Sequence, residues 1–392
     1  MKQMKHAYRA CAEISLDALE YNVKRIREVI GDDTALMCVI KANAYGHGAV
    51  PLARHLAKVG ADSFAVATVD EGIELRRAGI TQPILILGMS TKERYEDLIL
   101  HHITPTVYTY EIAKDISRTA AKLNMTADIH LKIDTGMSRI GFRADERTVQ
   151  EIIMISQMFT NLNIRGIFTH FACADGNDAE MTRRQAEEFQ WVIDSLEARG
   201  LHIPVRHCAN SAAIIRYPHL KMDMVRAGII LYGLRPSDEP DLMEFPLKPV
   251  MRLKSHIIML KNVPEGTAVG YGASFVCKRP TRIATVSIGY ADGFPRAQSN
   301  KGRVLIGAES FPVIGRVYMD QMMVDVTDAQ GSVRLGDEVI LVGSQGQENI
   351  TVEEASSYGD SFNYEFVCNI NRRVPRVYYS GERVTEIVNY LD

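Results

Sequence analysis

Polar residues stand within or directly after several short apolar runs in the first 235 residues of this chain. If those runs are parallel strands, their carboxyl ends lie at the same edge of a sheet or barrel, where the polar side chains meet. One such residue alone is a weak indication of a site, but their recurrence at corresponding places suggests a single constellation. The residues are Lys41, Lys132, Asp134, His170, Asn210, Ser211 and Arg226.

Lys41 carries the most specific chemistry of this set. It ends the apolar run MCVI and is followed by ANAYGHG, whose small residues allow a cofactor to approach the backbone. A lysine that is partly desolvated in a cleft has a lowered pKa and can form a Schiff base. The alternative is a lysine whose ammonium group simply extends from the strand end into solvent.

Other members of this set also allow a structural as well as a functional interpretation. His170 could be a hydrogen-bonded core histidine, and Ser211 could cap the short helix that follows it. A helix N-terminus beside a barrel mouth can instead bind phosphate. Arg226 precedes Ala-Gly-Ile, small residues after the eighth predicted strand, where barrels often bind phosphate.

The segments that position these residues alternate between the apolar spacing of strands and that of amphipathic helices. Runs rich in Val, Ile and Leu, separated by amphipathic segments, predict parallel strands with helical crossovers. Eight such units favour a closed (β/α)8 barrel. A doubly wound open sheet is the alternative, although no GxGxxG pattern follows the first strand. The predicted strands begin near residues 37, 63, 83, 104, 127, 164, 205 and 223.

The character of the chain changes after Pro236. Residues 237–249, SDEPDLMEFPLKP, are acidic and proline-rich and predict a linker. Strand-like runs such as TRIATVSIGY and DEVILVG follow, and only residues 352–359 indicate a helix. We therefore expect an α/β chain of two domains: a TIM-type barrel over residues 1–240 and a mostly β domain over residues 241–392.

Composition excludes several classes of protein. The 392 residues are 46% hydrophobic and 24% charged, with a net charge of −3, so a basic nucleic-acid surface is not expected. Six cysteines without a CxxC pair indicate buried thiols of a reduced compartment, not disulfides or a metal site. The sequence shows no signal-peptide core and no membrane-spanning run, so a cytoplasmic protein is expected.

Motifs along nearly the whole chain resemble those of the fold-type III alanine racemases, in the family's order. The resemblance implies a pyridoxal-phosphate-dependent racemase that interconverts L-alanine and D-alanine and supplies D-alanine for peptidoglycan. The motifs are KANAYGHG, LKIDTGMSRIGF, THFACAD, HCANSAA, VRAGIILYG, VGYGASF, SIGYADG, GRVYMDQ and NYEFVCNINRRVPR.

The resemblance implies that Lys41 holds pyridoxal 5′-phosphate covalently and that Arg226 faces the pyridine nitrogen. His170 would support Arg226 and help to orient a catalytic tyrosine. Hydroxyl groups and backbone amides would surround the phosphate. The residues implied in cofactor binding are Lys41, Tyr45, His170, Asn210, Ser211, Arg226, Gly228, Ile229 and Tyr364.

The resemblance also implies a substrate site. Arg139 and the backbone amide of Met319 would bind the substrate carboxylate. Lys132 matches a lysine that is carbamylated in the family and that positions this arginine. Tyr290 would narrow the entrance.

Tyr271, in VGYGASF, would be the second acid/base. Racemisation removes the α-proton from one face and returns a proton to the other, so Lys41 and Tyr271 would each serve one face. A tyrosine between glycines is usually a turn residue, and only the family resemblance gives it this role. In that family the tyrosine comes from the partner subunit, which implies a head-to-tail homodimer.

Two positions depart from the family pattern. Ser138 stands where many relatives have glycine, and Tyr318 precedes Met319 where many have cysteine. Tyr318 could alter which substrate side chains fit, so serine or a broader range of amino acids could replace alanine as the substrate. The sequence also leaves open a decarboxylase with the same domain plan and a non-catalytic pyridoxal-phosphate carrier.

Overall fold

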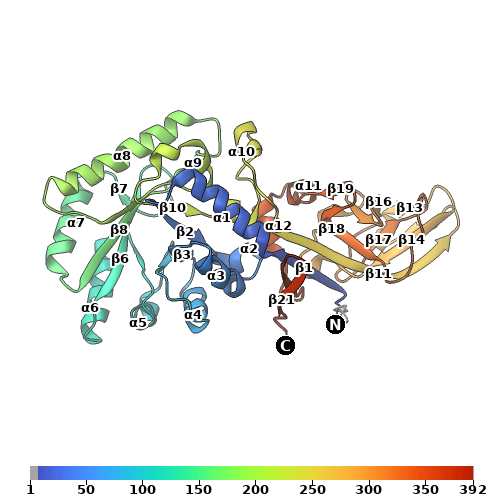
Figure 1. Ribbon diagram of the computed structural model, residues 1–392, viewed down its shortest axis with the longest axis horizontal. Coiled ribbons are helices and arrows are strands. Elements are labelled where there is room, and N and C mark those ends of the chain that lie inside the picture. The colour runs from blue at the N-terminus through green and yellow to red at the C-terminus, as the bar shows by residue number, and fades with distance from the viewer. Residues whose placement is uncertain (1–7, 392) are drawn as a thin grey trace. The chain divides into compact units, whose positions relative to one another are not determined.

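The computed structural model describes residues 8–391, which belong to two compact units (Figure 1). The first, called the barrel unit, contains residues 20–44 and 49–248. The second, called the β unit, contains the described residues before Glu20, residues 45–48 and the described residues from Pro249 onward. The change of unit at residues 248–249 therefore lies inside the predicted linker.

Eight parallel strands of the described residues close into the predicted barrel. They pair in the orders β10-β2-β3-β4 and β5-β6-β8-β9. A parallel bridge between Leu85 and Thr104 connects β4 with β5, and a hydrogen bond from Arg226 N to Ala209 O connects β10 with β9. The strands are β2 (Ala35–Val39), β3 (Ser63–Val66), β4 (Ile84–Ile86), β5 (Thr106–Val107), β6 (Ala127–Asp134), β8 (Leu162–Phe168), β9 (Val205–His207) and β10 (Met224–Ala227).

Helices cover the outside of this barrel (Figure 1). Side-chain caps mark where two of the helices begin. Thr68 and Glu71 form a capping box at the start of α4, and Asp145 caps the start of α7. A two-residue strand, β7 (Phe142–Arg143), pairs with the end of β6. The helices are α1 (Leu16–Ile30), α2 (Lys41–Tyr45), α3 (Ala49–Lys58), α4 (Val69–Arg77), η1 (Lys92–Arg94), α5 (Tyr95–Leu100), α6 (Tyr110–Lys122), α7 (Glu146–Met158), α8 (Ala179–Glu197), α9 (Ser211–Arg216), η2 (Pro218–Leu220), η3 (Ile229–Tyr232) and α10 (Pro240–Glu244).

The N-terminal strand lies in the β unit, whereas the sequence placed all of residues 1–240 in the barrel domain. β1 (Ala10–Ser15) pairs antiparallel with β11 (Met251–Val263) and parallel with β20 (Arg376–Ser380). Most of its residues are buried because it occupies an interior position of that sheet. Those pairings join segments far apart in sequence, which local patterns do not indicate.

The β unit is built on a ten-stranded sheet in the order β19-β18-β15-β16-β17-β14-β11-β1-β20-β21. A separate hairpin, β12 (Ala268–Val269) with β13 (Phe275–Val276), carries the VGYGASF motif. The other strands are β14 (Thr281–Val286), β15 (Arg303–Ile306), β16 (Glu309–Ile314), β17 (Met322–Asp325), β18 (Glu338–Gln345), β19 (Glu348–Ile350) and β21 (Arg383–Val388).

The β unit contains one α-helix more than the sequence indicated. α11 (Val352–Ser357) matches the predicted segment, but α12 (Asn363–Asn369) was not expected. α12 has seven residues and no side-chain cap, so its sequence lacks the usual start signal. Short 3-10 turns η4 (Tyr271–Ala273), η5 (Tyr290–Asp292) and η6 (Arg296–Gln298) complete the unit.

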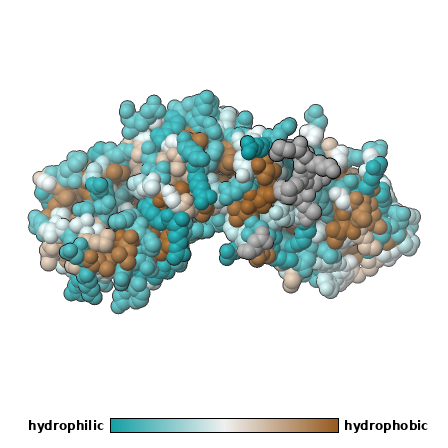
Figure 2. Space-filling model, turned by 60° about the horizontal axis from the view of Figure 1, so that its bottom comes forward, coloured by the Kyte–Doolittle hydropathy of each residue, from teal (hydrophilic) through white to brown (hydrophobic). Residues whose placement is uncertain are grey.

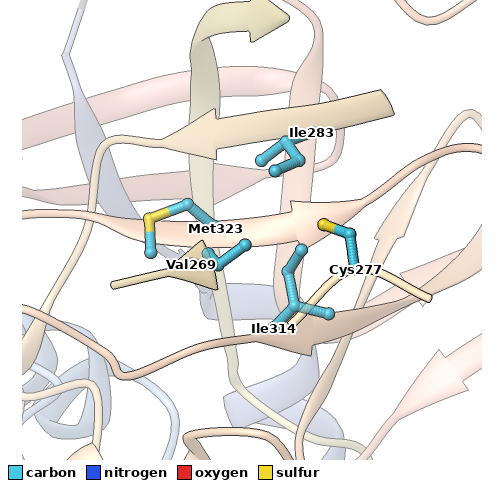
Figure 3. Close-up of a cluster of buried hydrophobic side chains, with 5 residues drawn as sticks. All are labelled: Val269, Cys277, Ile283, Ile314 and Met323. Atoms are coloured by element: carbon cyan, nitrogen blue, oxygen red, sulfur yellow. The ribbon is translucent and has the colours of Figure 1, made fainter. Parts of the chain in front are cut away.

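A hydrophobic cluster supports the β12–β13 hairpin (Figure 3). Phe275 and Tyr318 are partly buried and pack against it. The cluster joins the hairpin to the large sheet, because its side chains come from both. Its buried members are Val269, Cys277, Ile283, Ile314 and Met323.

Hydrophilic residues predominate on the face shown in Figure 2, and hydrophobic residues form separated patches there. None of the helices in the described part of the chain is both long and apolar enough to cross a membrane.

Candidate active site

The predicted barrel residues lie at the carboxyl ends of the parallel strands. Lys41 follows β2, Lys132 and Asp134 lie in the last part of β6, and His170 follows β8. Asn210, Ser211 and Arg226 lie after β9 or within β10. Because all eight strands run in parallel, these residues share one end of the barrel, as predicted.

The backbone that follows Lys41 is left-handed. Ala42, Asn43, Ala44 and Tyr45 all have φ between 50° and 55°. A left-handed turn of residues with side chains costs roughly 1–2 kcal/mol per residue. Strain of this kind persists only where the surrounding structure holds it.

Side chains of the barrel unit hold this segment. Glu71 Oε1 accepts a hydrogen bond from Ala42 N at 2.6 Å, while its Oε2 accepts one from Ala67 N at 2.7 Å. Asn43 Oδ1 accepts from Ala49 N at 2.8 Å, which ties the segment to the start of α3. The sequence indicated a permissive loop here but did not identify Glu71 or Asn43 as its supports.

Arg226 is the centre of a buried hydrogen-bond network. Its Nη1 donates to His207 Nδ1 at 3.0 Å and to His207 O at 3.1 Å. The two N–H groups of its Nη2 are shared among three acceptors: Thr169 O at 2.8 Å, His170 Nδ1 at 3.1 Å and Cys208 O at 2.9 Å. Nε makes no hydrogen bond within the described residues. The guanidinium group is therefore fixed in orientation, with one N–H group that the described residues leave without an acceptor.

His207 extends this network into the barrel, although the sequence did not identify it as a site residue. Its Nε2 lies 3.0 Å from His130 Nδ1. Burial, and then the charge of Arg226, lower the pKa of His207 and lower that of His130 to about 4. Both imidazoles are thus neutral at pH 7, so His207 accepts from Arg226 through Nδ1 and donates through Nε2 to His130.

Positive charges gather around His170. Burial lowers the pKa of His170 most, and the charges of Arg226, Lys132, Arg139 and Lys41 lower it further. The neutral imidazole can accept the hydrogen bond from Arg226 Nη2. Four basic residues of the barrel unit therefore lie close enough to His170 to affect its pKa.

Lys132 is almost completely buried, with 3% of its surface exposed. Its Nζ donates to Ile133 O at 2.9 Å and lies 5.2 Å from the centre of the Phe168 ring. Burial, followed by the charge of Arg226, lowers the pKa of Lys132 to about 7. About half of this lysine is consequently neutral at neutral pH.

Asp134 shapes the turn that leads to Arg139. Its Oδ1 accepts hydrogen bonds from Gly136 N and Ser138 N, both at 3.0 Å. Ser138 has φ 57°, a left-handed conformation that glycine adopts at lower cost. This conformation explains the glycine that the resemblance implies at that position. Arg139 itself is exposed.

The segment after β9 forms a second group of donors. Asn210 caps α9 by accepting a hydrogen bond from Ala213 N at 3.0 Å. The interpretation of Ser211 as the cap is therefore wrong. Ser211 Oγ instead accepts from Gly228 N at 3.0 Å, which joins the start of α9 to the residue before η3. Ile229 begins η3.

The β unit carries the remaining predicted residues. Tyr271 and Met319 are 74% and 52% exposed, and Tyr290 is exposed as well. Tyr45 is buried, and its ring centroid lies 6.0 Å from that of Tyr364. The predicted site residues thus form one group in the barrel unit and another in the β unit.

Hydrogen bonds join the segments of Tyr290 and Met319. Tyr290 N donates to Tyr318 O at 2.9 Å, and Ala291 N donates to Met319 O at 3.0 Å. A β-carbon at Gly289 would lie 2.2 Å from Tyr318 O, so only glycine allows this approach. The backbone therefore keeps Tyr290 and Met319 in neighbouring positions.

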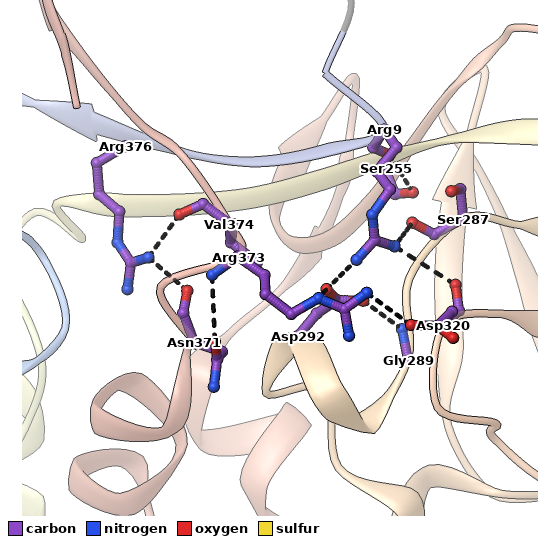
Figure 4. A network of polar contacts seen from close by, with 10 residues as sticks. All are labelled: Arg9, Ser255, Ser287, Gly289, Asp292, Asp320, Asn371, Arg373, Val374 and Arg376. Atoms are coloured by element: carbon purple, nitrogen blue, oxygen red, sulfur yellow. Dashed lines mark hydrogen bonds and ion pairs between the residues drawn. The ribbon is translucent and has the colours of Figure 1, made fainter. Parts of the chain in front are cut away.

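A charged network anchors the same segments (Figure 4). The buried carboxylate of Asp292 accepts hydrogen bonds from Gly289 N and from the Arg9 guanidinium group. Arg373 Nη2 donates to Asp320 Oδ1 at 2.6 Å. Arg9 and Arg373 therefore fix the two turns that carry Tyr290 and Met319. The sequence did not indicate either arginine as a support.

Comparison with known proteins gives consistent matches over both units. Residues 14–236 match the family model for the alanine racemase N-terminal domain, and residues 250–378 match that for the C-terminal domain. The alanine racemase of Halothermothrix orenii is 44% identical over 369 residues, which cover 94% of this chain and 96% of that protein.

Solved structures are similar over nearly the whole chain. An alanine racemase of Clostridium difficile 630 has a TM-score of 0.94 and 45% identity, covering 99% of this chain and 100% of that one. An alanine racemase of Bartonella henselae, described with covalently bound pyridoxal phosphate, has a TM-score of 0.84 and 29% identity, covering 95% and 100%.

Proposed function

Because this chain belongs to the alanine racemase family, we propose that Lys41 and Tyr271 are the acid/base pair with which it interconverts L-alanine and D-alanine. Membership makes it an amino-acid racemase, an isomerase that depends on pyridoxal 5′-phosphate. The observation that carries the proposal is the group of basic residues at the barrel end: the cations Lys41, Arg139 and Arg226 lie with Lys132 around His170.

This group of residues fits the cofactor and the substrate by charge. A phosphate ester and an amino-acid carboxylate are both anions, and clustered cations with oriented N–H groups bind such ligands. Arg226 Nε–H is not used by the described residues, so it can donate to an acceptor on a ligand. The fit therefore rests on charge and on an available donor.

We assign the cofactor contacts by the family motifs. Lys41 would hold the cofactor covalently, and Arg226 would face its ring nitrogen. Ser211 and the backbone of Gly228 and Ile229 would hold the phosphate, together with Tyr45, Tyr364 and Asn210. When bound, the cofactor withdraws electrons from the α-carbon of the amino acid and so acidifies its α-proton.

Lys41 Nζ and Tyr271 Oη move the proton in this proposal. One of them removes the α-proton from one face, and the other donates a proton to the opposite face. The C–H bond that breaks is replaced by one that forms, so the reaction needs no net proton. Arg139 and the amide of Met319 would hold the substrate carboxylate, which keeps the α-carbon between the two bases.

Arg226 would restrict the chemistry to proton exchange. Burial lowers the pKa of Arg226 to about 10, so the group remains a cation at neutral pH. A guanidinium group donates a hydrogen bond but does not readily give up its proton. The ring nitrogen would stay unprotonated, which weakens electron withdrawal and disfavours decarboxylation. This residue argues against a decarboxylase.

We further propose a cytoplasmic homodimer that supplies D-alanine for peptidoglycan, with a small-molecule amino acid as substrate. The exposure of Tyr271 and Met319 fits a role at a subunit interface, where each would complete the site of the partner. Tyr290 would narrow the entrance to that site.

Two measurements test the proposal. Chiral chromatography of reactions with L-alanine should show D-alanine, whereas carbon dioxide release indicates a decarboxylase and no reaction indicates a carrier. A panel including L-serine tests substrate range. Borohydride reduction should fix the cofactor to the peptide that contains Lys41, and labelling of a different lysine would overturn that assignment.

A further inference from the structure

The proposed base Tyr271 stands on a turn that holds its side chain weakly. The turn is a 3-10 segment of three residues, flanked by Gly270 with φ 79° and containing Gly272 with φ 70°. Tyr271 is 74% exposed, and its hydroxyl makes no hydrogen bond within the described residues. An exposed tyrosine of this kind samples several rotamers unless a neighbour restricts it.

Tyr318 is that neighbour. Its ring centroid lies 5.0 Å from that of Tyr271, with the planes inclined at 73°, a T-shaped contact. The Tyr318 hydroxyl also lies against the turn itself: a β-carbon at Gly270 would be only 2.7 Å from it. Tyr318 therefore touches both the ring of Tyr271 and the backbone that carries it.

Tyr318 is itself well anchored. Its side chain packs against the hydrophobic cluster that contains Val269 and Ile314. Its backbone N donates to Gln321 O at 2.8 Å, and its O accepts from Tyr290 N at 2.9 Å. An anchored ring thus packs against an exposed one, an arrangement that restricts the rotamers of the exposed side chain.

We infer that Tyr318 is a positioning residue for racemisation, which holds the Tyr271 ring in the orientation that proton transfer requires. The inference rests on the proposed role of Tyr271 as a base. The same residue links the Tyr271 turn to Met319 and Tyr290, so one side chain and its backbone set the relative positions of three proposed site residues.

The test compares three variants of the complete enzyme with cofactor bound. Tyr318→Leu removes the ring but keeps an apolar side chain on the cluster. Loss of a T-shaped ring contact should lower kcat by roughly two- to tenfold. Tyr318→Phe keeps the ring and should remain within about twofold of the parent enzyme. Phe275→Leu is the matched control, because Phe275 packs on the same cluster.

The decisive readout is the α-deuterium isotope effect measured with each enantiomer. Enantiomers have equal free energies, so kcat/KM must fall equally in both directions. A misplaced Tyr271 makes its own proton transfer slower relative to the other steps. Tyr318→Leu should therefore raise the isotope effect on kcat/KM for the enantiomer that Tyr271 deprotonates, and not for the other. General destabilisation would change neither isotope effect.

Tyr271→Phe distinguishes the proposed role of Tyr271 as a base from the positioning role of Tyr318. If Tyr271→Phe racemises alanine normally, the proposed base is wrong, whatever Tyr318 does. If Tyr271→Phe is inactive but Tyr318→Leu equals Phe275→Leu in rate and isotope effects, the positioning role is refuted. Should Tyr318→Leu not fold, Tyr318→Met, which retains a long apolar side chain, makes the same comparison.

Discussion

Lys132 should react with carbon dioxide at neutral pH to form a carbamate. The reaction needs a neutral amine: its lone pair forms an N–C bond, a C=O π bond opens and one proton is released. Burial and the charge of Arg226 lower the pKa of Lys132 to about 7, while Ile133 O holds its Nζ in place. The product would be an anion that can pair with the exposed Arg139.

The size of this effect follows from the pKa. At pH 7 a lysine with the ordinary pKa of 10.5 is neutral in roughly 0.03% of molecules, but one with a pKa of about 7 is neutral in roughly half. The reactive fraction is therefore larger by about three orders of magnitude. Since the neutral fraction grows as pH rises through about 7, modification should be strongly reduced near pH 5.

Carbon-13 NMR of the protein in labelled bicarbonate measures this modification directly. The parent enzyme should show a protein-bound carbamate signal at pH 7.5 that weakens as the pH is lowered. Lys132→Ala provides the assignment, since the signal should disappear while other lysines remain. No signal in the parent, or the same signal in Lys132→Ala, would refute the reasoning about Lys132.

Three other changes test the rest of the site. Arg226→Glu should slow racemisation and allow pyruvate to form by transamination, because a carboxylate favours a protonated ring nitrogen; an unchanged rate with no pyruvate would contradict the proposed role. Lys41→Ala and Tyr271→Phe should each be inactive, yet mixed subunits should recover about half the activity per heterodimer if each site draws on both chains; no recovery despite proven exchange would place both bases in one chain. Glu71→Ala should lower the free energy of unfolding by about 2 kcal/mol in urea titrations, because the N–H groups of Ala42 and Ala67 lose their acceptors; Glu71→Gln, which keeps one acceptor, should lose less.

The barrel was predictable because its strands are buried on both faces. Parallel strands covered by helices read as continuous apolar runs, and each predicted start lies within two residues of an observed strand. The polar residues at their ends could also be identified, since a charged group at the end of a buried strand is conspicuous. By contrast, β1 joins the β unit through pairing with β11 and β20, and local pattern carries no information about such distant partners.

The hydrogen-bond network around Arg226 was only partly predictable. His170 was identified, but neither His207, which bonds to Arg226, nor His130, which bonds to His207, was identified. A signal for His130 was available: it stands two residues before Lys132 on one strand, so both side chains point to the same side. The sequence alone does not show that this side faces the barrel interior, nor that a neutral histidine accepts the hydrogen bond from Arg226. Those facts depend on which strands are adjacent.

The backbone conformation of the segment after Lys41 could not be predicted from the sequence. Small residues there predicted a backbone that a cofactor can approach, but not its conformation: the chain adopts four consecutive left-handed residues, none of them glycine. Intrinsic preference opposes this conformation at roughly 1–2 kcal/mol per residue. The acceptor for Ala42 N is the side chain of Glu71, which lies 29 positions further along the chain. The orientation of the proposed catalytic lysine therefore depends on tertiary contacts that overcome local preference, which is why the motif could identify Lys41 but could not describe its backbone.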